Sequence, residues 1–376
     1  MDDQVKQTKF KLPGWGKTVI IVVLTLVIAA GVLCLALGRS GIALMEGWLL
    51  AKYAFVDTEA DLDGAAHEAL DALVEGLGDR WSYYLDEDYY KQVMQNRANN
   101  YVGVGVTVSN LDERGLLVEK LTAGGPAEAA GVQVGDLIIA VDGVSIAGEA
   151  RYNASDLIRG EVNTQVILTL QDPEGVLRDV TCTRKRLSNP SASGELLEGN
   201  VGHVYLANFY SGAADSFRSV VEDLMARGAE SLVVDLRSCP GGYVDELKEI
   251  LNYLLPEGPV FTQKSRWWVQ SVYESDAECI DLPIVVLVNA DSYSAAELLA
   301  AQLRESIGAP IVGEGTSGKG YSQITFKLPN GGGMGLSTAT YCTGSGHSLI
   351  GEGILPDILI EGDANVQLQA ALDLLK

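Results

Sequence analysis

Residues 284–297 read IVVLVNADSYSAAE, and this stretch decides how the rest of the chain is interpreted. The run at 284–289 is apolar and rich in β-branched residues, which is typical of a buried strand. Between residues 294 and 305 apolar side chains recur at helical spacing, and the residues just before this segment are helix-capping types. We therefore expect Ser294 at or just inside the start of a helix that leaves a sheet strand.

At that position Ser294 could act as a nucleophile. Free backbone N–H groups and the positive end of a helix dipole stabilise an oxyanion formed beside the serine. The alternative is an ordinary serine in the first turn of a helix. The chain has only three histidines, so the usual base for a serine nucleophile is scarce. A lysine can take that role if burial lowers its pKa.

Such a lysine lies in residues 313–320, which read GEGTSGKG and nearly spell a phosphate-binding loop. Two departures argue against nucleotide binding: Gly320 stands where a magnesium-binding Ser or Thr is needed, and residues 321–328 alternate like a strand. The flanking glycines let the backbone bring Lys319 close to another segment. Gln323, four residues on, is expected on the same strand face, where it would hold the amine. A solvated lysine in a glycine turn is the alternative.

These residues resemble the C-terminal processing peptidases, also called tail-specific proteases. The family pattern is S-A-S-A-S-E after a strand, then G-x-x-[ST]-x-G-K-G, with a glutamine four positions after the lysine. The resemblance implies that Ser294 is the nucleophile, that Lys319, 25 residues later, is the base, and that Gln323 orients it. Tyr293 and Ala296 depart from the pattern without replacing a catalytic residue, and Tyr293 is expected to narrow or line the site.

A third motif supports the match. Residues 232–242 read LVVDLRSCPGG and resemble the family's D-L-R-x-N-x-G-G turn, with Cys239 in place of asparagine. By this resemblance the N–H groups of Gly242 and Ala295 form the oxyanion hole. A glycine lets the backbone approach a reacting carbonyl without a Cβ clash. An ordinary strand-to-helix turn is the alternative. The resemblance covers roughly residues 60–362.

Residues 101–187 resemble a PDZ domain, although from the residues alone they predict only a small β-rich domain. Val104, Gly105 and Val106 match its carboxylate-binding loop and following strand, where consecutive N–H groups bind a peptide's C-terminal carboxylate. Arg159 falls where related proteases carry an arginine linked to PDZ positioning; a plain surface arginine is the equal alternative.

The segment just before this domain, residues 79–85, reads DRWSYYL and resembles the family's G-D-P-Y-S-x-Y-L segment. Its aromatic side chains are expected in a core rather than at a ligand.

Composition sets wide limits. The chain has 376 residues, a 47% hydrophobic share and a formal net charge of −23, which suits two or three domains and argues against a nucleic-acid partner. The five cysteines and three histidines show no metal-ligand spacing, so no metal and no cofactor are expected. One or two disulfides and free buried thiols both stay open. The cysteines are Cys34, Cys182, Cys239, Cys279 and Cys342.

The N-terminal region predicts a membrane anchor. Residues 18–38 carry no charge over about 21 residues, long enough to cross a bilayer as a helix. Four lysines precede this run, so the positive-inside rule places residues 1–17 in the cytoplasm and the rest of the chain outside. A cleaved signal peptide is the alternative, although the run is longer than a usual signal. Either reading exports the catalytic part.

Together these patterns predict a mixed α/β and β multidomain protein. Strands and helices alternate from residue 201 onward, which implies a sheet with helices packed on it, and the resemblance implies a protease core of the crotonase/ClpP-like kind. Residues 190–194 are the expected linker. The expected parts are a cytoplasmic tail at 1–17, a transmembrane helix at 18–38, a helical region at 41–100, a PDZ domain at 101–187 and a serine protease core at 195–376.

The expected function is a membrane-anchored, extracytoplasmic serine endopeptidase whose PDZ domain recognises the C-terminal tails of protein substrates. A free lysine has a pKa of about 10.4, which leaves about one part in two thousand neutral at pH 7. The fold must therefore keep Lys319 dry and away from Glu297 and Glu314. The alternatives are an inactive PDZ scaffold and an acyl-CoA-type enzyme on a related α/β fold. The oligomeric state stays open, with a homo-oligomer among the alternatives.

Overall fold

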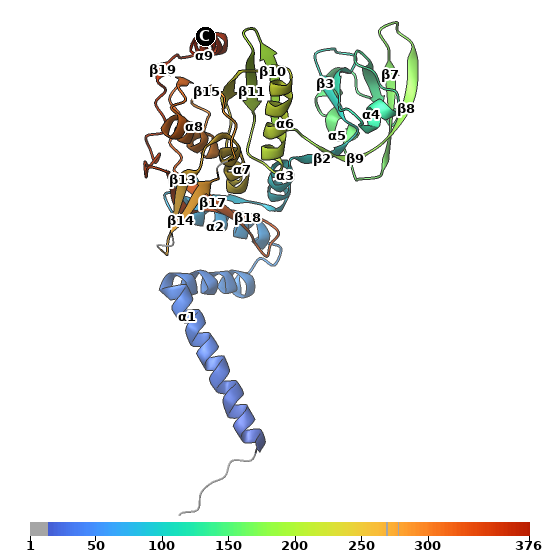
Figure 1. The fold of residues 1–376 in the computed structure, drawn as a ribbon. Helices are drawn as coiled ribbons and strands as arrows, with labels where there is room; N and C mark the ends of the chain where they lie inside the picture. The colour runs from blue at the N-terminus through green and yellow to red at the C-terminus, as the bar shows by residue number, and fades with distance from the viewer. Residues whose placement is uncertain (1–13, 268–269, 277) are drawn as a thin grey trace, which may run out of the picture. The chain divides into compact units, whose positions relative to one another are not determined.

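The computed structural model describes residues 14–267, 270–276 and 278–376 (Figure 1). The chain divides into two compact units, residues 1–73 and 74–376, which are described separately. Of the expected cytoplasmic tail, residues 1–13 lie outside the described residues.

The first unit is dominated by helix α1 (Gly14–Ala54), whose backbone leaves helical geometry at Gly38, with φ of 62° and ψ of −175°. This break coincides with the end of the predicted membrane segment, and the second part of α1 begins the helical region expected at 41–100. Residues 21–54 include a window with a mean hydropathy of 2.8 that is wholly unburied, so the helix is long and apolar enough to span a bilayer. Helix α2 (Leu62–Glu75) follows, within the helical region expected at 41–100.

The second unit contains a six-stranded sheet in the order β10-β11-β12-β15-β16-β19. Strand β10 runs antiparallel to β11, and the other neighbours are parallel. Every residue of β12 and β15 is buried, which explains their continuous apolar sequences. The strands are β10 (Ala192–Leu197), β11 (Val201–Leu206), β12 (Ser231–Asp235), β15 (Ile284–Val288), β16 (Ile311–Gly313) and β19 (Ile358–Leu359).

Helices cover both faces of this sheet. Leu232 and Val234 share a hydrophobic cluster with residues of α6, α7 and α8, whereas Val233 packs in a second cluster with Ala371 of α9. Successive side chains of a strand point to opposite faces, so the three layers follow from the sequence of β12. The predicted α/β core is confirmed. The helices are α6 (Ala213–Ala226), α7 (Val244–Leu254), α8 (Ala295–Ile307) and α9 (Ala364–Asp373).

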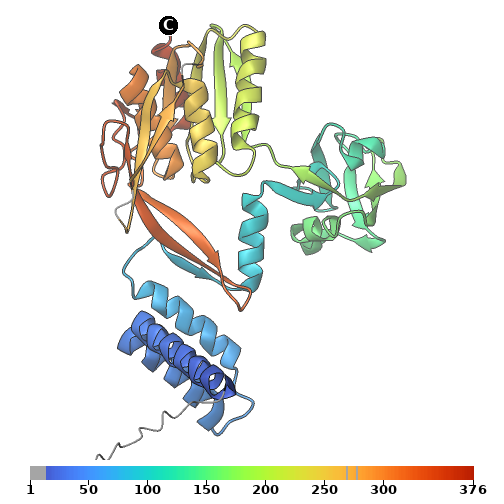
Figure 2. The same cartoon turned by 60° about the horizontal axis from the view of Figure 1, so that its bottom comes forward.

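A second sheet carries one wall of the site described below. Its strand order is β1-β18-β13-β14, and β17 also pairs with β18. Figure 2 shows the long β17–β18 hairpin with β1 beside it. The strand predicted at residues 321–328 is confirmed as β17, and β18 follows it, whereas β13 and β14 were not predicted. The bounds are β1 (Tyr83–Leu85), β13 (Gly258–Ser265), β14 (Gln270–Ser275), β17 (Tyr321–Lys327) and β18 (Gly333–Thr343).

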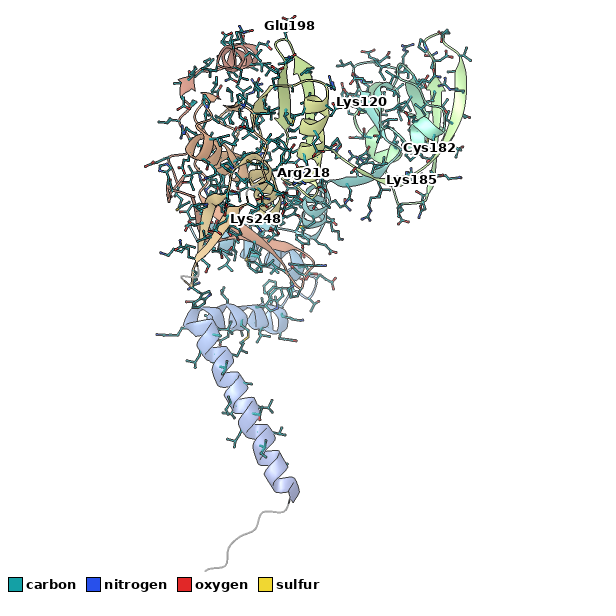
Figure 3. All side chains as sticks on the ribbon, in the orientation of Figure 1. Lys120, Cys182, Lys185, Glu198, Arg218 and Lys248 are labelled. Carbon is teal, nitrogen blue, oxygen red and sulfur yellow. The ribbon has the colours of Figure 1, made fainter. Side chains whose placement is uncertain are left out.

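Helix α3 (Glu87–Arg97) leads from β1 into the PDZ region through an antiparallel pair, β2 (Asn100–Gly103) with β9 (Lys185–Ser188). The PDZ sheet has its own core, which includes the buried Cys182 (Figure 3). Its strand order is β3-β4-β5-β7-β8, with β6 on β5. Its elements are β3 (Val106–Ser109), β4 (Leu116–Leu121), α4 (Pro126–Ala129), β5 (Leu137–Val141), β6 (Val144–Ser145), the 3₁₀ helix η1 (Gly148–Tyr152), α5 (Ala154–Ile158), β7 (Gln165–Gln171) and β8 (Leu177–Thr183).

The linker predicted at residues 190–194 is wrong in part. Ala192 already pairs with Leu206 as the first residue of β10, so the core sheet begins inside the expected linker. The Pro, Ser and Gly residues there suggested a loop, but cross-strand pairing with β11 overrides that local preference. The cysteines at positions 34, 182, 239, 279 and 342 are all free thiols.

Candidate active site

One cavity of about 590 Å³ brings together all five residues predicted for catalysis and for the oxyanion hole. They come from three places: the β15–α8 turn with the first residue of α8, the β12–α7 turn, and β17 with the loop before it. The five residues are Ser294, Lys319, Gln323, Gly242 and Ala295.

Ser294 is the N-cap residue of α8, so its predicted position at the helix start is confirmed. Its φ of 62° and ψ of −122° are unusual for a residue with a side chain, and such backbones cost about 1–3 kcal/mol. The Ser294 N–H donates to Glu297 Oε2 at 2.8 Å, which helps to hold this conformation. The N–H groups of the first turn of α8 and the positive end of its dipole therefore lie next to the serine.

Lys319 is a buried amine with a fixed partner. Its Nζ donates to Gln323 Oε1 at 2.6 Å, and the Gln323 amide nitrogen donates in turn to the Trp81 carbonyl. Burial, reinforced by the positive charge of Arg97, lowers the pKa of Lys319 to about 8, while Asp79 and Glu297 act in the opposite direction. Lys319 itself lies two residues before β17, and the strand register shifts between Ser322 and Gln323. The lysine and glutamine thus meet by a loop and a bulge, not by simple strand alternation.

Glu297 ties the two catalytic segments together. Its carboxylate is fully buried; Oε2 accepts from the N–H groups of Ser294 and Lys319, at 2.8 and 3.0 Å. Oε1 accepts from the Gly318 N–H at 2.8 Å and the Thr316 hydroxyl at 2.6 Å. From the sequence, Glu297 was expected only to oppose a neutral amine if it came close, and its role in joining the two segments was not predicted. The available signal was an acidic residue three positions after a serine at a helix start, as in a capping box.

The expectation that the two nearby carboxylates turn away from the amine is confirmed. Glu297 binds main-chain N–H groups and a hydroxyl, and Glu314 accepts from the Gly362 N–H at 2.9 Å. Among the residues that the structure describes, no carboxylate oxygen lies within 4.0 Å of Lys319 Nζ.

Two glycines let the β12–α7 turn approach the start of α8. A Cβ on Gly241, whose φ is 76°, would lie 2.8 Å from the Ala295 nitrogen and 2.9 Å from the Ser294 Cβ. A Cβ on Gly242 would lie 2.3 Å from the Phe209 carbonyl oxygen. Only glycine fits at either position. Gly241 was not singled out from the sequence, although the Gly-Gly pair was the signal.

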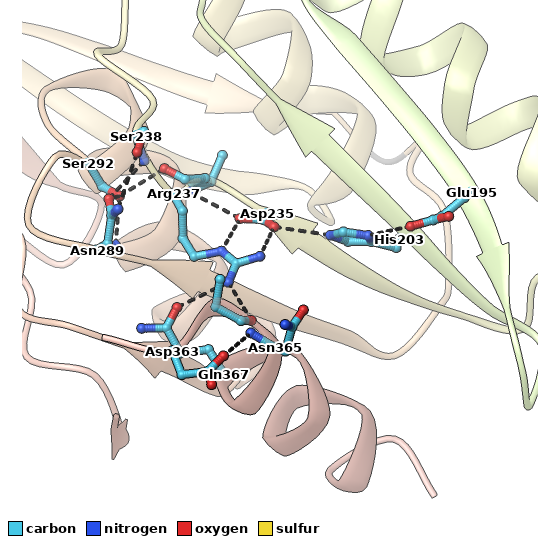
Figure 4. Close-up of polar contacts among 12 residues, drawn as sticks. Glu195, His203, Asp235, Arg237, Ser238, Asn289, Ser292, Asp363, Asn365 and Gln367 are labelled. Atoms are coloured by element: carbon cyan, nitrogen blue, oxygen red, sulfur yellow. Dashed lines mark hydrogen bonds and ion pairs between the residues drawn. The ribbon is translucent and has the colours of Figure 1, made fainter. Parts of the chain in front are cut away.

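Polar contacts fix the ends of β12 and β15 at these turns (Figure 4). The Ser292 hydroxyl donates to the Leu236 carbonyl at 2.8 Å, and the Ser238 N–H donates to Asn289 Oδ1 at 2.8 Å. Further along β12, Asp235 accepts from Arg237, whose Nη1 also donates to the Ala364 carbonyl of α9 at 2.8 Å. These bonds hold the two turns at a fixed separation.

The same network holds His203, a residue of β11, in a structural position. Its Nε2 lies 3.0 Å from Asp235 Oδ2. Burial lowers the pKa of His203, but hydrogen bonds to Asp235 and Glu195 outweigh it and raise the pKa above the ordinary value. Cys239, the departure from the family turn, is buried, and burial raises its pKa to about 12, so it stays a neutral thiol.

The prediction that the aromatic residues before α3 lie in a core is wrong for two of them. Trp81 and Tyr83 were expected in a core, yet both line the cavity. The Trp81 ring lies 6.2 Å from that of Tyr293, centroid to centroid, at an angle of 29°. Arg97 Nη2 donates to the Tyr83 hydroxyl at 2.9 Å. Long-range pairing of β1 with β18 brings this segment to the site, which no local pattern reveals.

The residues predicted to bind a peptide carboxylate lie at the start of the PDZ sheet. Val104 is buried and its carbonyl accepts from the Ala127 N–H at 2.8 Å, while Gly105 has a φ of 82°. Val106 opens β3, which pairs with β4 and ends the sheet on that side within the described residues. Arg159 is exposed, 4.0 Å from the Asp156 carboxylate.

Comparison with known proteins agrees with this geometry. The model of peptidase family S41 matches residues 200–360, and a PDZ domain model matches residues 117–172. A carboxyl-terminal-processing protease of Picosynechococcus sp. is 31% identical over 346 residues, which cover 88% of this chain and 84% of the relative. The carboxy-terminal processing protease CtpA of Bacillus subtilis (strain 168) is 30% identical over 305 residues, covering 81% of this chain and 65% of the relative.

A solved structure titled photosystem II D1 C-terminal processing protease is similar with a TM-score of 0.50 and 25% identity, covering 90% of this chain and 97% of that one. An α/β core with a PDZ domain, and a cavity lined by a serine at a helix start and by a buried lysine, fit a class of serine peptidase. The chain belongs to peptidase family S41. It is a serine peptidase that carries a PDZ domain.

Proposed function

We propose that this peptidase is a membrane-anchored, extracytoplasmic endopeptidase that processes protein C-termini through a Ser294–Lys319 dyad. One observation carries the proposal: Lys319 is an amine only 9% exposed, held by Gln323, in the same cavity as Ser294 at the N-terminus of α8. Burial favours the uncharged amine that a serine nucleophile needs as its base.

In the proposed reaction, neutral Lys319 takes the proton from the Ser294 hydroxyl as the serine oxygen attacks a peptide carbonyl. The N–H groups of Gly242 and Ala295 bind the resulting oxyanion. Gln323 holds the amine within the cavity that Ser294 also lines, since its own amide is fixed by the Trp81 carbonyl. Lys319 then gives its proton to the leaving amine, and water hydrolyses the acyl-enzyme by the same route in reverse.

Within this proposal, residues 1–17 form the cytoplasmic tail, 18–38 the anchor, 41–100 the N-terminal helical region, 101–187 the PDZ domain and 195–376 the protease core. The unburied apolar window of α1 supports an anchor. The edge strand β3, with Val104, Gly105 and Val106 at its start, supports recognition of a substrate's C-terminal tail by strand addition. Arg159 is proposed as a residue that positions the PDZ domain.

The pH dependence follows from the lowered pKa of the base. With a pKa of about 8, Lys319 is mostly an ammonium at pH 7 and mostly neutral at pH 9. Cleavage requires the neutral form, so activity should rise with pH, by about tenfold between pH 7 and pH 9. Initial rates of fluorescein-casein cleavage across pH 6–10 measure this. A rate that stays flat from pH 7 to 9 would contradict the assignment of Lys319 as base.

Substrate processing is tested in the organism's own membranes. Mass spectrometry of protein C-termini should find peptides shortened at their C-terminal ends in cells with the wild type and full-length in cells with Ser294→Ala. The Ser294→Ala protein keeps the PDZ domain, so binding alone cannot produce the difference. Identical C-termini in the two strains would favour the inactive PDZ scaffold instead.

A further inference from the structure

The surroundings of the Lys319 amine contain two aromatic faces. Nζ lies 5.0 Å from the centroid of the Trp81 ring and 5.7 Å from that of Tyr293. The two rings are 6.2 Å apart and 29° from parallel. The amine's hydrogen-bond acceptor is Gln323 Oε1, at 2.6 Å. The amine thus lies against two rings and one neutral oxygen, with no carboxylate within 4.0 Å among the described residues.

This arrangement suits a base that must be neutral before the reaction and charged during it. A carboxylate partner would stabilise the ammonium strongly and would keep the lysine protonated from the start. An aromatic face attracts a cation more weakly, through the negative face of its π system. Two rings can therefore stabilise the ammonium that develops in the transition state without keeping the lysine protonated before the reaction.

We propose that Trp81 and Tyr293 form an aromatic clamp that stabilises the Lys319 ammonium created when the amine accepts the proton of Ser294. In that step the Ser294 O–H bond breaks and an N–H bond forms on Nζ. The serine oxygen bonds to the substrate carbonyl carbon, whose oxygen receives the electron pair of the C=O double bond. The inference rests on the proposed Ser–Lys mechanism.

Both clamp residues depart from the family pattern quoted above. Tyr293 stands where that pattern has alanine, and Trp81 stands where it has tyrosine. Each is also held in place. The Tyr293 N–H donates to the Cys239 carbonyl at 3.1 Å, and the Trp81 ring packs 4.3 Å from the Arg80 guanidinium carbon. The Tyr293 ring is therefore particular to this chain, whereas the tyrosine of the pattern at the position of Trp81 also carries a ring.

The other ionisable groups near the amine come from four elements. They are Asp79 before β1, Arg97 at the end of α3 and Glu297 in α8, together with Tyr341 of β18, whose hydroxyl donates to the main-chain carbonyl of Lys319. Arg80, on the Trp81 ring, is the further cation of this region. All of them are kept unchanged in the variants below, so a change in pH dependence reports on the rings.

The test compares variants that keep or remove the π face while keeping an apolar side chain. Trp81→Phe and Tyr293→Phe retain a ring, whereas Trp81→Leu and Tyr293→Leu do not. The probe is a fluorophosphonate-rhodamine reagent, and the measurement is the second-order rate of Ser294 labelling from pH 6 to 10. We expect the Phe variants to stay within about threefold of wild type, and each Leu variant to lose about threefold to thirtyfold at the high-pH plateau.

The midpoint of the pH profile separates the clamp from simple shielding. Without a ring to stabilise the ammonium, the midpoint of each Leu variant should move to lower pH. If the rings only exclude water, the Leu variants admit water, the ammonium is better solvated, and the midpoint moves to higher pH, which overturns the proposal. Equal rates and midpoints for matched Phe and Leu variants would also overturn it.

Controls separate a failed clamp from a failed mechanism. Trp267 is 80% exposed with Arg266 5.8 Å from its ring, so Trp267→Leu removes a comparable surface pair and should label like wild type. If wild-type Ser294 is not labelled at all, the Ser–Lys mechanism itself is wrong. If it is labelled and the Leu variants behave like the Phe variants, only the clamp is wrong. Thermal unfolding identifies any variant that fails to fold. If a variant at one ring does not fold, the Phe and Leu variants at the other ring test the clamp.

Discussion

Replacing Lys319 with methionine is expected to abolish proteolysis while leaving the fold intact. Methionine keeps an unbranched apolar stem in the same space, so packing is preserved, but it cannot accept a proton. The loss of the general base should lower the casein cleavage rate by at least about a thousandfold. The melting temperature should stay level or rise, because a buried amine with a depressed pKa is replaced by an apolar group.

The matched control is Lys120→Met, which removes an exposed lysine of the PDZ strand β4 (Figure 3). That variant should cleave casein at the wild-type rate. Substantial turnover by the Lys319→Met enzyme, at the wild-type pH optimum, would show that another group takes the proton and that Lys319 is not the base.

Glu297→Ala should be the most damaging change that leaves both proposed dyad residues in place. It removes the one buried carboxylate that accepts from the N–H groups of Ser294, Gly318 and Lys319 and from the Thr316 hydroxyl. Each hydrogen bond to a charged acceptor contributes about 1.5–3 kcal/mol, so the free energy of unfolding should fall by about 3 kcal/mol or more. Activity should be lost as well, since both catalytic segments lose their common anchor.

Glu297→Gln should not restore activity, because its NH₂ group would face two N–H donors. Urea unfolding and casein cleavage measure both effects, with Glu314→Gln as the control for a carboxylate of this loop that accepts from the Gly362 N–H. A Glu297→Gln protein as stable and as active as wild type would show that the carboxylate charge does not hold the two segments together.

The sequence predicted the parts of the site that local chemistry encodes. The continuous apolar runs of β12 and β15 predicted buried parallel strands, and Ser294 was correctly expected at a helix start. The short-range pairing of Lys319 with Gln323 was also anticipated, although a loop and a bulge produce it. These features depend on residues close together in the chain, where spacing carries geometric information.

The features that were missed depend on distant contacts. Trp81 reaches the site because β1 pairs with β18, across about 250 residues of chain, and its sequence surroundings predicted only burial. Strand β14 (Gln270–Ser275) is largely polar and mostly exposed, so neither hydrophobic periodicity nor burial marked it in the sequence. The start of β10 could not be predicted from the sequence, because its pairing with β11 overrides the loop-forming preference of Ser193 and Gly194.

The central claim is that an uncharged Lys319 activates Ser294, and peptide mapping after covalent labelling tests it most directly. Wild-type protein and Lys319→Met are treated with a fluorophosphonate across pH 6–10, digested, and analysed by mass spectrometry. We expect one adduct, on Ser294. In the wild type its rate of formation should have a midpoint near pH 8, and the adduct should be absent from Lys319→Met. An adduct on another residue, or equal labelling of Ser294 in both proteins, would contradict it.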